Sequence, residues 1–182
     1  MLIWLLVNVS THQTRPHLLV IGGTGFIGYH LVLHAKKKRW KVTSVSLGQP
    51  QKYRYVKGVK YLKIDITDFE KLKKKLIGSF TYIVNLGGYV DHSSLKKSSK
   101  LMTKVHFQGL INLTRIFLKR KLKKFVQVGS GAEYGDSKAP QNEKQQSSPK
   151  TSYALAKLAS NKFLLKLYNA QKFPVSILRF FQ

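Results

Sequence analysis

Three glycines with the spacing GxxGxxG follow a short apolar run early in the chain. The run at residues 17–21 reads HLLVI, and Gly22, Gly25 and Gly28 come directly after it. In this pattern the first glycine permits a tight turn, the second lets a pyrophosphate approach the backbone, and the third lets a helix pack closely on the strand. Amides that open the next helix would hold the phosphates. The residues predict a dinucleotide-binding loop, with a purely structural turn as the alternative.

A tyrosine and a lysine four residues apart suggest proton transfer. Tyr153 and Lys157 would share one face of an expected helix. An ammonium beside a phenol favours the phenolate and lowers its pKa from about 10, which suits proton exchange with a carbinol or carbonyl. The same spacing occurs twice more, at Tyr53/Lys57 and Tyr168/Lys172.

Position distinguishes Tyr153 from the other two tyrosines. Tyr53 lies in a loop on the expected adenosine side, and Tyr168 lies about 22 Å further along the same helix. Tyr153 opens its helix near the carboxyl edge of the sheet, where ligands bind. Ser130 ends the preceding strand at that edge and could hydrogen-bond the substrate oxygen while Tyr153 exchanges its proton. An ordinary loop serine is the alternative.

The adenosine end of the expected site lacks an acidic residue. Residues 41–47 would supply a carboxylate for the ribose, but Ser46 stands there instead. NAD and NADP therefore both remain open. Asp65 and Ile66 are placed to meet the adenine, although Asp65 could equally be a carboxylate at a helix start. Three basic residues could meet a 2′-phosphate: Lys52, Arg54 and Lys57.

Strand-like and helix-like segments alternate along the chain, which predicts an α/β fold with a doubly wound parallel sheet of the Rossmann type and helices on both faces. Thr67 and Glu70 match a capping box at the start of the second helix. Strands are expected at residues 17–21, 41–45, 60–64, 81–85, 124–128 and 174–178, and helices at 26–38, 67–76, within 101–118 and at 152–168.

The amino-acid composition limits which kinds of binding partner and metal site the chain can have. The 182 residues include 33 Lys plus Arg against 7 Asp plus Glu, a net charge of +26 that invites a nucleic-acid hypothesis. The lysine runs fall mostly at expected helix ends, where cations suit the helix dipole, so we favour solvated lysines and disfavour nucleic acid as a partner. Cysteine is absent, which excludes disulfides and Cys-ligated metals and fits a cytoplasmic location.

Other features predict little chemistry. The apolar run MLIWLLVNV at the start is too short to span a bilayer, and we treat residues 1–16 as a leader of uncertain nature. His30 and His34 share a helix face without a third ligand nearby, so no metal site is expected. No GxSxG hydrolase motif occurs.

Three ordered motifs resemble one family. GGTGFIG at 22–28, SxxxYG at 130–135 and YxxxK at 153–157 are similar to the NAD-dependent epimerase/dehydratase group of extended short-chain dehydrogenases/reductases, which act on nucleotide sugars. The resemblance extends over residues 18–181. It implies Ser130, Tyr153 and Lys157 as the catalytic set. The cofactor-binding residues expected from the loops and the resemblance are Gly22, Gly25, Phe26, Ile27, Gly28, Ser46, Asp65, Ile66, Leu86, Gly87, Gly88, Tyr153 and Lys157.

This chain departs from the family pattern at several positions, and these differences bear on the expected reaction and on the expected extent of the domain. Dehydratases of the group have two acidic residues after the catalytic hydroxyl, where this chain has Gly131 and Ala132. An asparagine common in the fourth helix is replaced around residues 106–108. The family continues into a sugar-binding domain, whereas this chain ends at Gln182, so residues 17–182 are expected to be a truncated NAD(P)-binding domain.

The resemblance thus implies an NAD(P)-dependent nucleotide-sugar epimerase or 4-keto-sugar reductase with Tyr153 as acid and base. The implied binding partner is a nucleotide sugar. A homodimer is compatible with the sequence, which does not determine the oligomeric state. Two alternatives stay open: a cofactor-binding fragment without turnover, and a basic Rossmann-like module that binds nucleic acid.

Overall fold

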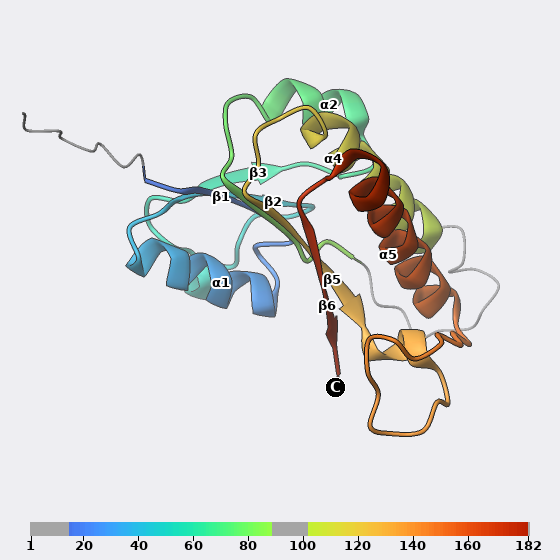
Figure 1. Ribbon diagram of the computed structural model, residues 1–182. Coiled ribbons are helices and arrows are strands. Elements are labelled where there is room, and N and C mark those ends of the chain that lie inside the picture. Colours follow the sequence, from blue (N-terminus) through green and yellow to red (C-terminus); the bar gives the residue numbers. More distant parts are fainter. Residues whose placement is uncertain (1–14, 89–101, 182) are drawn as a thin grey trace, which may run out of the picture.

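Six parallel strands form one sheet in the order β3-β2-β1-β4-β5-β6 (Figure 1). The computed structural model describes residues 15–88 and 102–181. The strand order reverses between β1 and β4, and ligands of open α/β sheets bind at the carboxyl ends of the strands beside such a reversal. The strands are β1 (His17–Ile21), β2 (Lys41–Ser46), β3 (Lys60–Lys63), β4 (Tyr82–Asn85), β5 (Lys124–Ser130) and β6 (Val175–Phe180).

Helices cover both faces of the sheet, so the expected doubly wound Rossmann-type fold is confirmed. One correction concerns the helix expected within residues 101–118, which is a π-helix followed by an α-helix. The α-helices are α1 (Phe26–Lys37), α2 (Phe69–Lys75), α4 (Gly109–Phe117) and α5 (Ser152–Gln171). The shorter turns are the 3₁₀ helices η1 (Lys52–Arg54) and η3 (Gly131–Tyr134) and the π-helix η2 (Thr103–Gln108).

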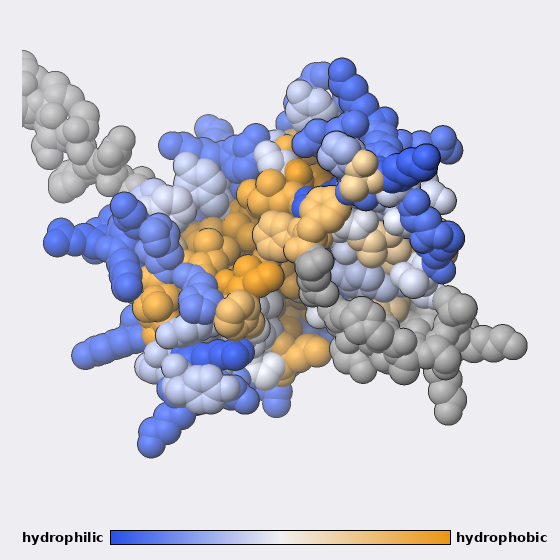
Figure 2. All heavy atoms as spheres, turned by 90° about the horizontal axis from the view of Figure 1, so that it is seen from below, coloured by the Kyte–Doolittle hydropathy of each residue, from blue (hydrophilic) through white to orange (hydrophobic). Residues whose placement is uncertain are grey.

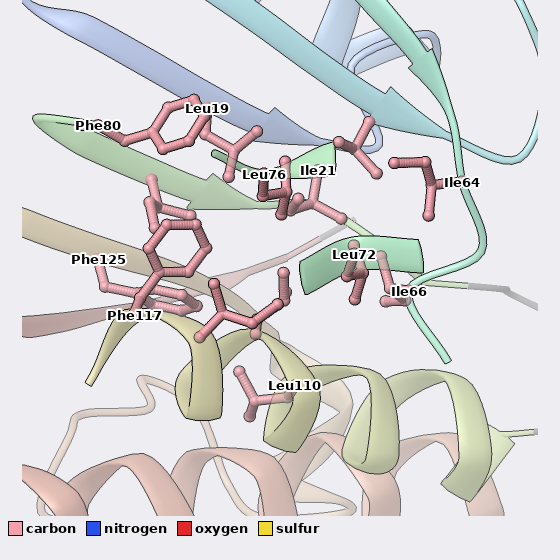
Figure 3. Close-up of a cluster of buried hydrophobic side chains, with 14 of the residues drawn as sticks. Leu19, Ile21, Ile64, Ile66, Leu72, Leu76, Phe80, Leu110, Phe117 and Phe125 are labelled. Carbon is pink, nitrogen blue, oxygen red and sulfur yellow. The ribbon is translucent and has the colours of Figure 1, made fainter. Parts of the chain in front are cut away.

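The central strand β1 divides its apolar side chains between two hydrophobic clusters. Leu18 and Val20 pack with Val32 of α1 on one face. Leu19 and Ile21 belong to the larger cluster on the opposite face (Figure 3). Alternation with a period of two is what a strand buried on both faces requires. The larger cluster also contains side chains from the helices on that face: Leu72 of α2 with Leu76 directly after it, Leu110, Leu113 and Phe117 of α4, and Leu164 of α5.

The start of α2 differs from the predicted capping box. Asp68, not Thr67, is the N-cap residue, and its side chain accepts a hydrogen bond from the Lys71 amide. The Thr67 amide instead donates to Asp65 Oδ1 at 2.8 Å. A carboxylate is as good an N-cap as a threonine hydroxyl, so two adjacent candidates competed and local turn geometry selected one.

Lysines gather where the sequence predicts, at the ends of helices. The last turn of α1 contains Lys36 and Lys37, and the last turn of α2 contains Lys73 to Lys75. Neither turn contains an acidic residue. Cations there interact favourably with the helix dipole. Among the described helices, none is both long and apolar enough to span a bilayer.

A tight turn joins β1 to α1 and depends on two glycines. Gly22 has a φ of 81°, in the left-handed region that glycine adopts without strain, and its amide donates to Val45 O at 2.7 Å. Gly28 packs against the same turn so closely that a Cβ would lie 2.2 Å from Gly22 O and 2.6 Å from Gly23 Cα. The third glycine of the motif therefore lets α1 approach β1.

We predict that Gly28→Ala lowers the free energy of unfolding by about 2 kcal/mol, because the backbone of the turn must move away from the new methyl group. Gly25→Ala is the matched control: its Cβ would have Gly22 O as nearest neighbour at 3.4 Å. We expect that control to cost at most about 1 kcal/mol. Urea unfolding of the three proteins measures both values, and equal losses in the two variants would contradict the packing argument.

Candidate active site

The amino end of α1 is open to an anion. Its N-cap is Gly25, without a side-chain hydrogen bond, and its first turn contains no acidic residue. By contrast, Asp68 caps α2 and Thr151 caps α5 through their side chains. The first amides of α1 therefore have no side-chain acceptor, and this is how a helix receives a phosphate. Phe26 and Ile27, also expected near the cofactor, are exposed at this end.

The residues expected at the adenosine end are tied to the surrounding loops. Ser46 ends β2, and its Oγ accepts a hydrogen bond from the Thr24 amide at 3.3 Å, so it holds the glycine loop. Asp65 is exposed and, as described above, caps the Thr67 amide. Ile66 is buried, with its Cδ1 2.6 Å from where a Cβ on Gly109 would lie. Asp65 thus stabilises the turn before α2, whereas the helix-start carboxylate is Asp68.

The segment after β4 lies directly beside the glycine loop. The Leu86 amide donates to Ile21 O at 3.0 Å, and a Cβ on Gly22 would lie 3.1 Å from the Leu86 carbonyl. Asn85 is buried at the end of β4, where its Oδ1 accepts from the Gly87 amide at 3.1 Å. Its Nδ2 donates to the buried Gln127 Oε1 on β5 at 2.8 Å. The end of β4 is thereby held to the neighbouring strand β5 and to the loop that follows β4.

Ser130, Tyr153 and Lys157 meet at the carboxyl end of β5. Ser130 is the last residue of β5 and is hydrogen-bonded to the half-buried Tyr153 at the start of α5. One turn further along α5, the Lys157 ammonium donates to Val128 O at 2.8 Å and lies 5.7 Å from the Tyr153 ring centroid. The structure therefore brings the three expected catalytic side chains together, although they come from separate parts of the chain.

Burial controls the protonation of the tyrosine and lysine. It raises the pKa of Tyr153 above 10, and the hydrogen bond from Ser130 opposes that change only in part. Burial also lowers the pKa of Lys157 to about 8, against the opposing effect of the nearby Glu133 carboxylate. The expected lowering of the phenol pKa by the ammonium is thus not found in the chain by itself. Desolvation penalises both charged forms and is the largest cause of both shifts.

His106 lies in the segment where an asparagine of the family pattern is replaced, and the sequence assigned it no role at the site. It lies in η2 and is buried, and its ring stands edge-on to Tyr153 with 5.3 Å between centroids. A Cβ on Gly88 would lie 2.2 Å from the His106 ring, so Gly88 gives the imidazole its space. Ser160 Oγ donates to the His106 carbonyl at 3.0 Å. Side-chain contacts of this kind between distant segments leave no periodic signal in the sequence.

Glu133 is the second residue that sequence reasoning missed, and here a signal existed. Ser130 and Glu133 have the S-x-x-E spacing of a capping box, and both reciprocal hydrogen bonds are present in η3. The pattern marks a helix start rather than chemistry, so it did not indicate a role at the site. Within residues 15–88 and 102–181 no group of potential ligands is arranged for a metal, and His30 and His34 are exposed.

Exposed apolar side chains lie near the end of β6. Figure 2 shows the side of the molecule where β6 ends, with an apolar area between hydrophilic flanks. Large exposed apolar residues of this strand end are Leu178, Phe180 and Phe181. Apolar area of this kind beside a polar site is typical of a contact surface.

A family model for the NAD dependent epimerase/dehydratase family matches residues 18–182. The chain is 27% identical over 177 residues to a UDP-N-acetyl-alpha-D-glucosaminuronate decarboxylase from Bacillus cytotoxicus, covering 92% of this chain and 54% of the relative. It is 25% identical over 188 residues to a dTDP-D-glucose 4,6-dehydratase from Dictyostelium discoideum, covering 89% and 42%. A solved UDP-glucose 4-epimerase from Thermus thermophilus in complex with NAD has a TM-score of 0.78 and 26% identity, covering 90% and 54%.

The chain therefore belongs to the NAD dependent epimerase/dehydratase family. It spans about half the length of these relatives.

The buried Lys157 predicts a specific dependence of stability on pH. Burial lowers the pKa of Lys157 to about 8 in the folded protein, whereas the ordinary pKa of a lysine, which the unfolded chain retains, is 10.5. Between these values the unfolded chain binds more protons, so the free energy of unfolding rises with pH. Relative to Lys157→Met, we expect wild type to gain up to about 3 kcal/mol from pH 8 to 10.5. Urea unfolding across this range measures the gain, and a constant difference between the proteins would contradict the burial of an ionisable ammonium.

Proposed function

We propose that this chain binds NAD or NADP and forms the cofactor-binding part of a nucleotide-sugar epimerase or 4-keto-sugar reductase. The observation that carries the proposal is the meeting of Ser130, Tyr153 and Lys157 at the sheet edge that also carries the open amino end of α1. The family and the nucleotide-sugar substrates named for its relatives support it. A nucleotide sugar is therefore the proposed substrate class.

Each catalytic side chain would have one task. In the chain by itself Tyr153 is a neutral phenol, because burial raises its pKa, and this form would donate its proton to a keto-sugar oxygen as that carbon is reduced, while the phenolate form would take the proton of a sugar hydroxyl as that carbon is oxidised. Ser130 would hold that oxygen by a hydrogen bond, and the Lys157 ammonium would stabilise the phenolate that forms. A bound nicotinamide would accept hydride from the sugar carbon and return it.

The surroundings of Ser130 favour epimerase or reductase chemistry over dehydration. A dehydratase of the group would need an acidic side chain at position 131. Here Gly131 packs against Phe181, and a Cβ would lie 2.6 Å from the Phe181 ring atom Cδ1. A longer side chain has no room without moving that ring, so this chain lacks both the first acid and the space for it.

The residues of the adenosine end are compatible with both nicotinamide cofactors. Ser46 offers no carboxylate to select a 2′-hydroxyl, and its hydroxyl is already used by the glycine loop. Lys52 and Lys57 are exposed in the segment between β2 and β3, and Arg54 lies over the Tyr53 ring at 5.4 Å. These cations could meet a 2′-phosphate, so NADH and NADPH are both to be tested.

Cofactor binding is tested with Gly25→Asp. The new carboxylate would lie at the uncapped amino end of α1 and repel a pyrophosphate, while the space around Gly25 lets the chain keep its fold. We expect the affinity for NADH or NADPH to fall at least about 100-fold, the scale of a buried like-charge contact. Cofactor fluorescence titration measures it. Lys121→Asp, an exposed change at the opposite edge of the sheet, controls for net charge.

If Gly25→Asp bound NADH or NADPH as tightly as wild type, the cofactor phosphates would not bind at the amino end of α1. An equal loss in Lys121→Asp would mean that overall charge, and not the loop, attracts the cofactor.

Proton transfer is tested with Tyr153→Phe. We expect the rate of cofactor reduction by a nucleotide sugar to fall at least about 100-fold, because the exchangeable proton of the phenol is lost. Tyr168→Phe is a closely matched control, since Lys172 lies 5.7 Å from the Tyr168 ring, as Lys157 does from Tyr153. Absorbance at the reduced nicotinamide band follows the reaction, and full activity in Tyr153→Phe would remove the residue from its proposed role.

A further inference from the structure

Glu133 places a fully buried carboxylate at the end of β5. Its carboxylate receives hydrogen bonds from three different segments. The Ser130 amide donates to Oε1 at 2.8 Å, and Arg179 Nε on β6 donates to Oε2 at 3.0 Å. Asn161 Nδ2 on α5 lies 2.7 Å from Oε1 and 2.8 Å from Oε2. Burying a carboxylate is costly unless it is paired and hydrogen-bonded, and here both conditions are met.

Gly129 provides the space that the carboxylate occupies. A Cβ at this position would lie 2.6 Å from Glu133 Oε1 and 2.8 Å from Asn161 Nδ2. Any larger residue at 129 would therefore displace the carboxylate or the amide. Arg179 is held in turn, because its second nitrogen donates to Tyr134 Oη at 2.9 Å. One carboxylate thus joins the end of β5, the middle of α5 and the end of β6.

The residues that hold Glu133 adjoin those expected to do the chemistry. Tyr153, Lys157 and Asn161 follow one another at intervals of four residues along α5, so they lie on one face of the helix. Through Ser130 and Asn161, the Glu133 carboxylate attaches the last residue of β5 to that face. The same carboxylate raises the pKa of Lys157 and so opposes part of the effect of burial.

We propose that Glu133 is a positioning residue of the active site, which holds Ser130 against the Tyr153 face of α5 and supplies the negative charge that balances the buried Lys157 ammonium. It acts through these residues and does not itself touch the reacting atoms. The inference rests on the proposed function for the roles of Ser130, Tyr153 and Lys157. The hydrogen bonds that Glu133 receives and the effect of its charge on Lys157 are both present in the protein without any ligand, so both can be measured there.

Other ionisable groups in the described part of the region are Tyr153 on α5, Tyr134 on η3, Arg179 on β6 and His106 on η2. The charge that acts on the Lys157 pKa is that of Glu133. A carboxylate with a purely structural role would affect folding stability, but it would leave the titration of Lys157 unchanged in a folded variant. The titration of this one lysine therefore separates the two roles.

The test is an NMR titration of ¹³C-labelled lysine side chains in wild type, Glu133→Gln and Asp136→Asn, with Lys157→Met to assign the signal. Glu133→Gln should increase the acid dissociation constant of Lys157 about tenfold, the lower end of what a close opposite charge contributes. Asp136→Asn also removes a carboxylate from this segment, but an exposed one, and should leave Lys157 unchanged. An unshifted Lys157 in folded Glu133→Gln would overturn the proposal.

A second variant keeps the test decisive if the first does not fold. Glu133→Gln leaves the Arg179 guanidinium without its carboxylate, so Glu133→Gln/Arg179→Met removes both charges together. Lys157 should shift in the same direction as in Glu133→Gln but by less, because removal of the neighbouring guanidinium offsets part of the lost negative charge. Glu133→Asp retains the charge on a shorter side chain, and we expect Lys157 to titrate near its wild-type value in that variant. A shift as large as that of Glu133→Gln would overturn the assigned effect of charge.

Cofactor binding distinguishes failure of this inference from failure of the proposed function. Because Lys157 is one of the residues proposed to bind the cofactor, NADH affinity should begin to fall at lower pH in Glu133→Gln than in wild type. Identical pH profiles with intact NADH binding would overturn the role of Glu133 and leave the proposed function in place. Absence of saturable NADH binding to wild type would overturn the proposed function, while the lysine titration would still decide the role of Glu133.

Discussion

The parallel direction of all six strands is the constraint on which the candidate site depends. Every strand ends at the same edge of the sheet, so the segments after β1, β4 and β5 meet there although long stretches of chain separate them. The close approach of Gly28 to the Gly22 carbonyl sets the start of α1 at this edge. Contacts between neighbouring strands, such as that of Asn85 at the end of β4 with Gln127 of β5, then help to hold the loop after β4 in place. Chemistry at this edge follows from topology before any single side chain is considered.

The parallel direction of the strands also determines where the charged side chains of this basic chain lie relative to the site. Helices run back across the sheet, so their carboxyl ends and the lysines in their last turns lie away from the strand ends that carry the site. In the described part of the chain, the carboxylates follow β3 or β5: Asp65, Asp68 and Glu70, then Glu133, Asp136 and Glu143. The buried one among them, Glu133, is paired with Arg179. The +26 net charge is thus compatible with a polar site, because most lysines remain solvated.

Several elements could be predicted from the sequence because their signals are local. Apolar runs predicted all six strands to within a few residues, and the glycine spacing predicted the turn between β1 and α1. Errors arose where local signals were ambiguous or absent. The capping-box pattern pointed to Thr67, whereas Asp68 is the N-cap, and the π-helix η2 has no distinct composition. Side-chain contacts between distant segments stabilise the latter, including that of Ser160 with the His106 carbonyl.

By itself the sequence determined the order of the elements, the glycine-rich turn after β1 and the candidate residues Ser130, Tyr153 and Lys157, because spacing along one strand or helix is a local property. Tertiary structure alone decided how these residues are protonated and held. Burial, a property of the packed fold, raises the pKa of Tyr153 and lowers that of Lys157. Only folding brings Asn161 and Arg179 to Glu133, since they come from separate elements and meet within hydrogen-bond distance of one carboxylate.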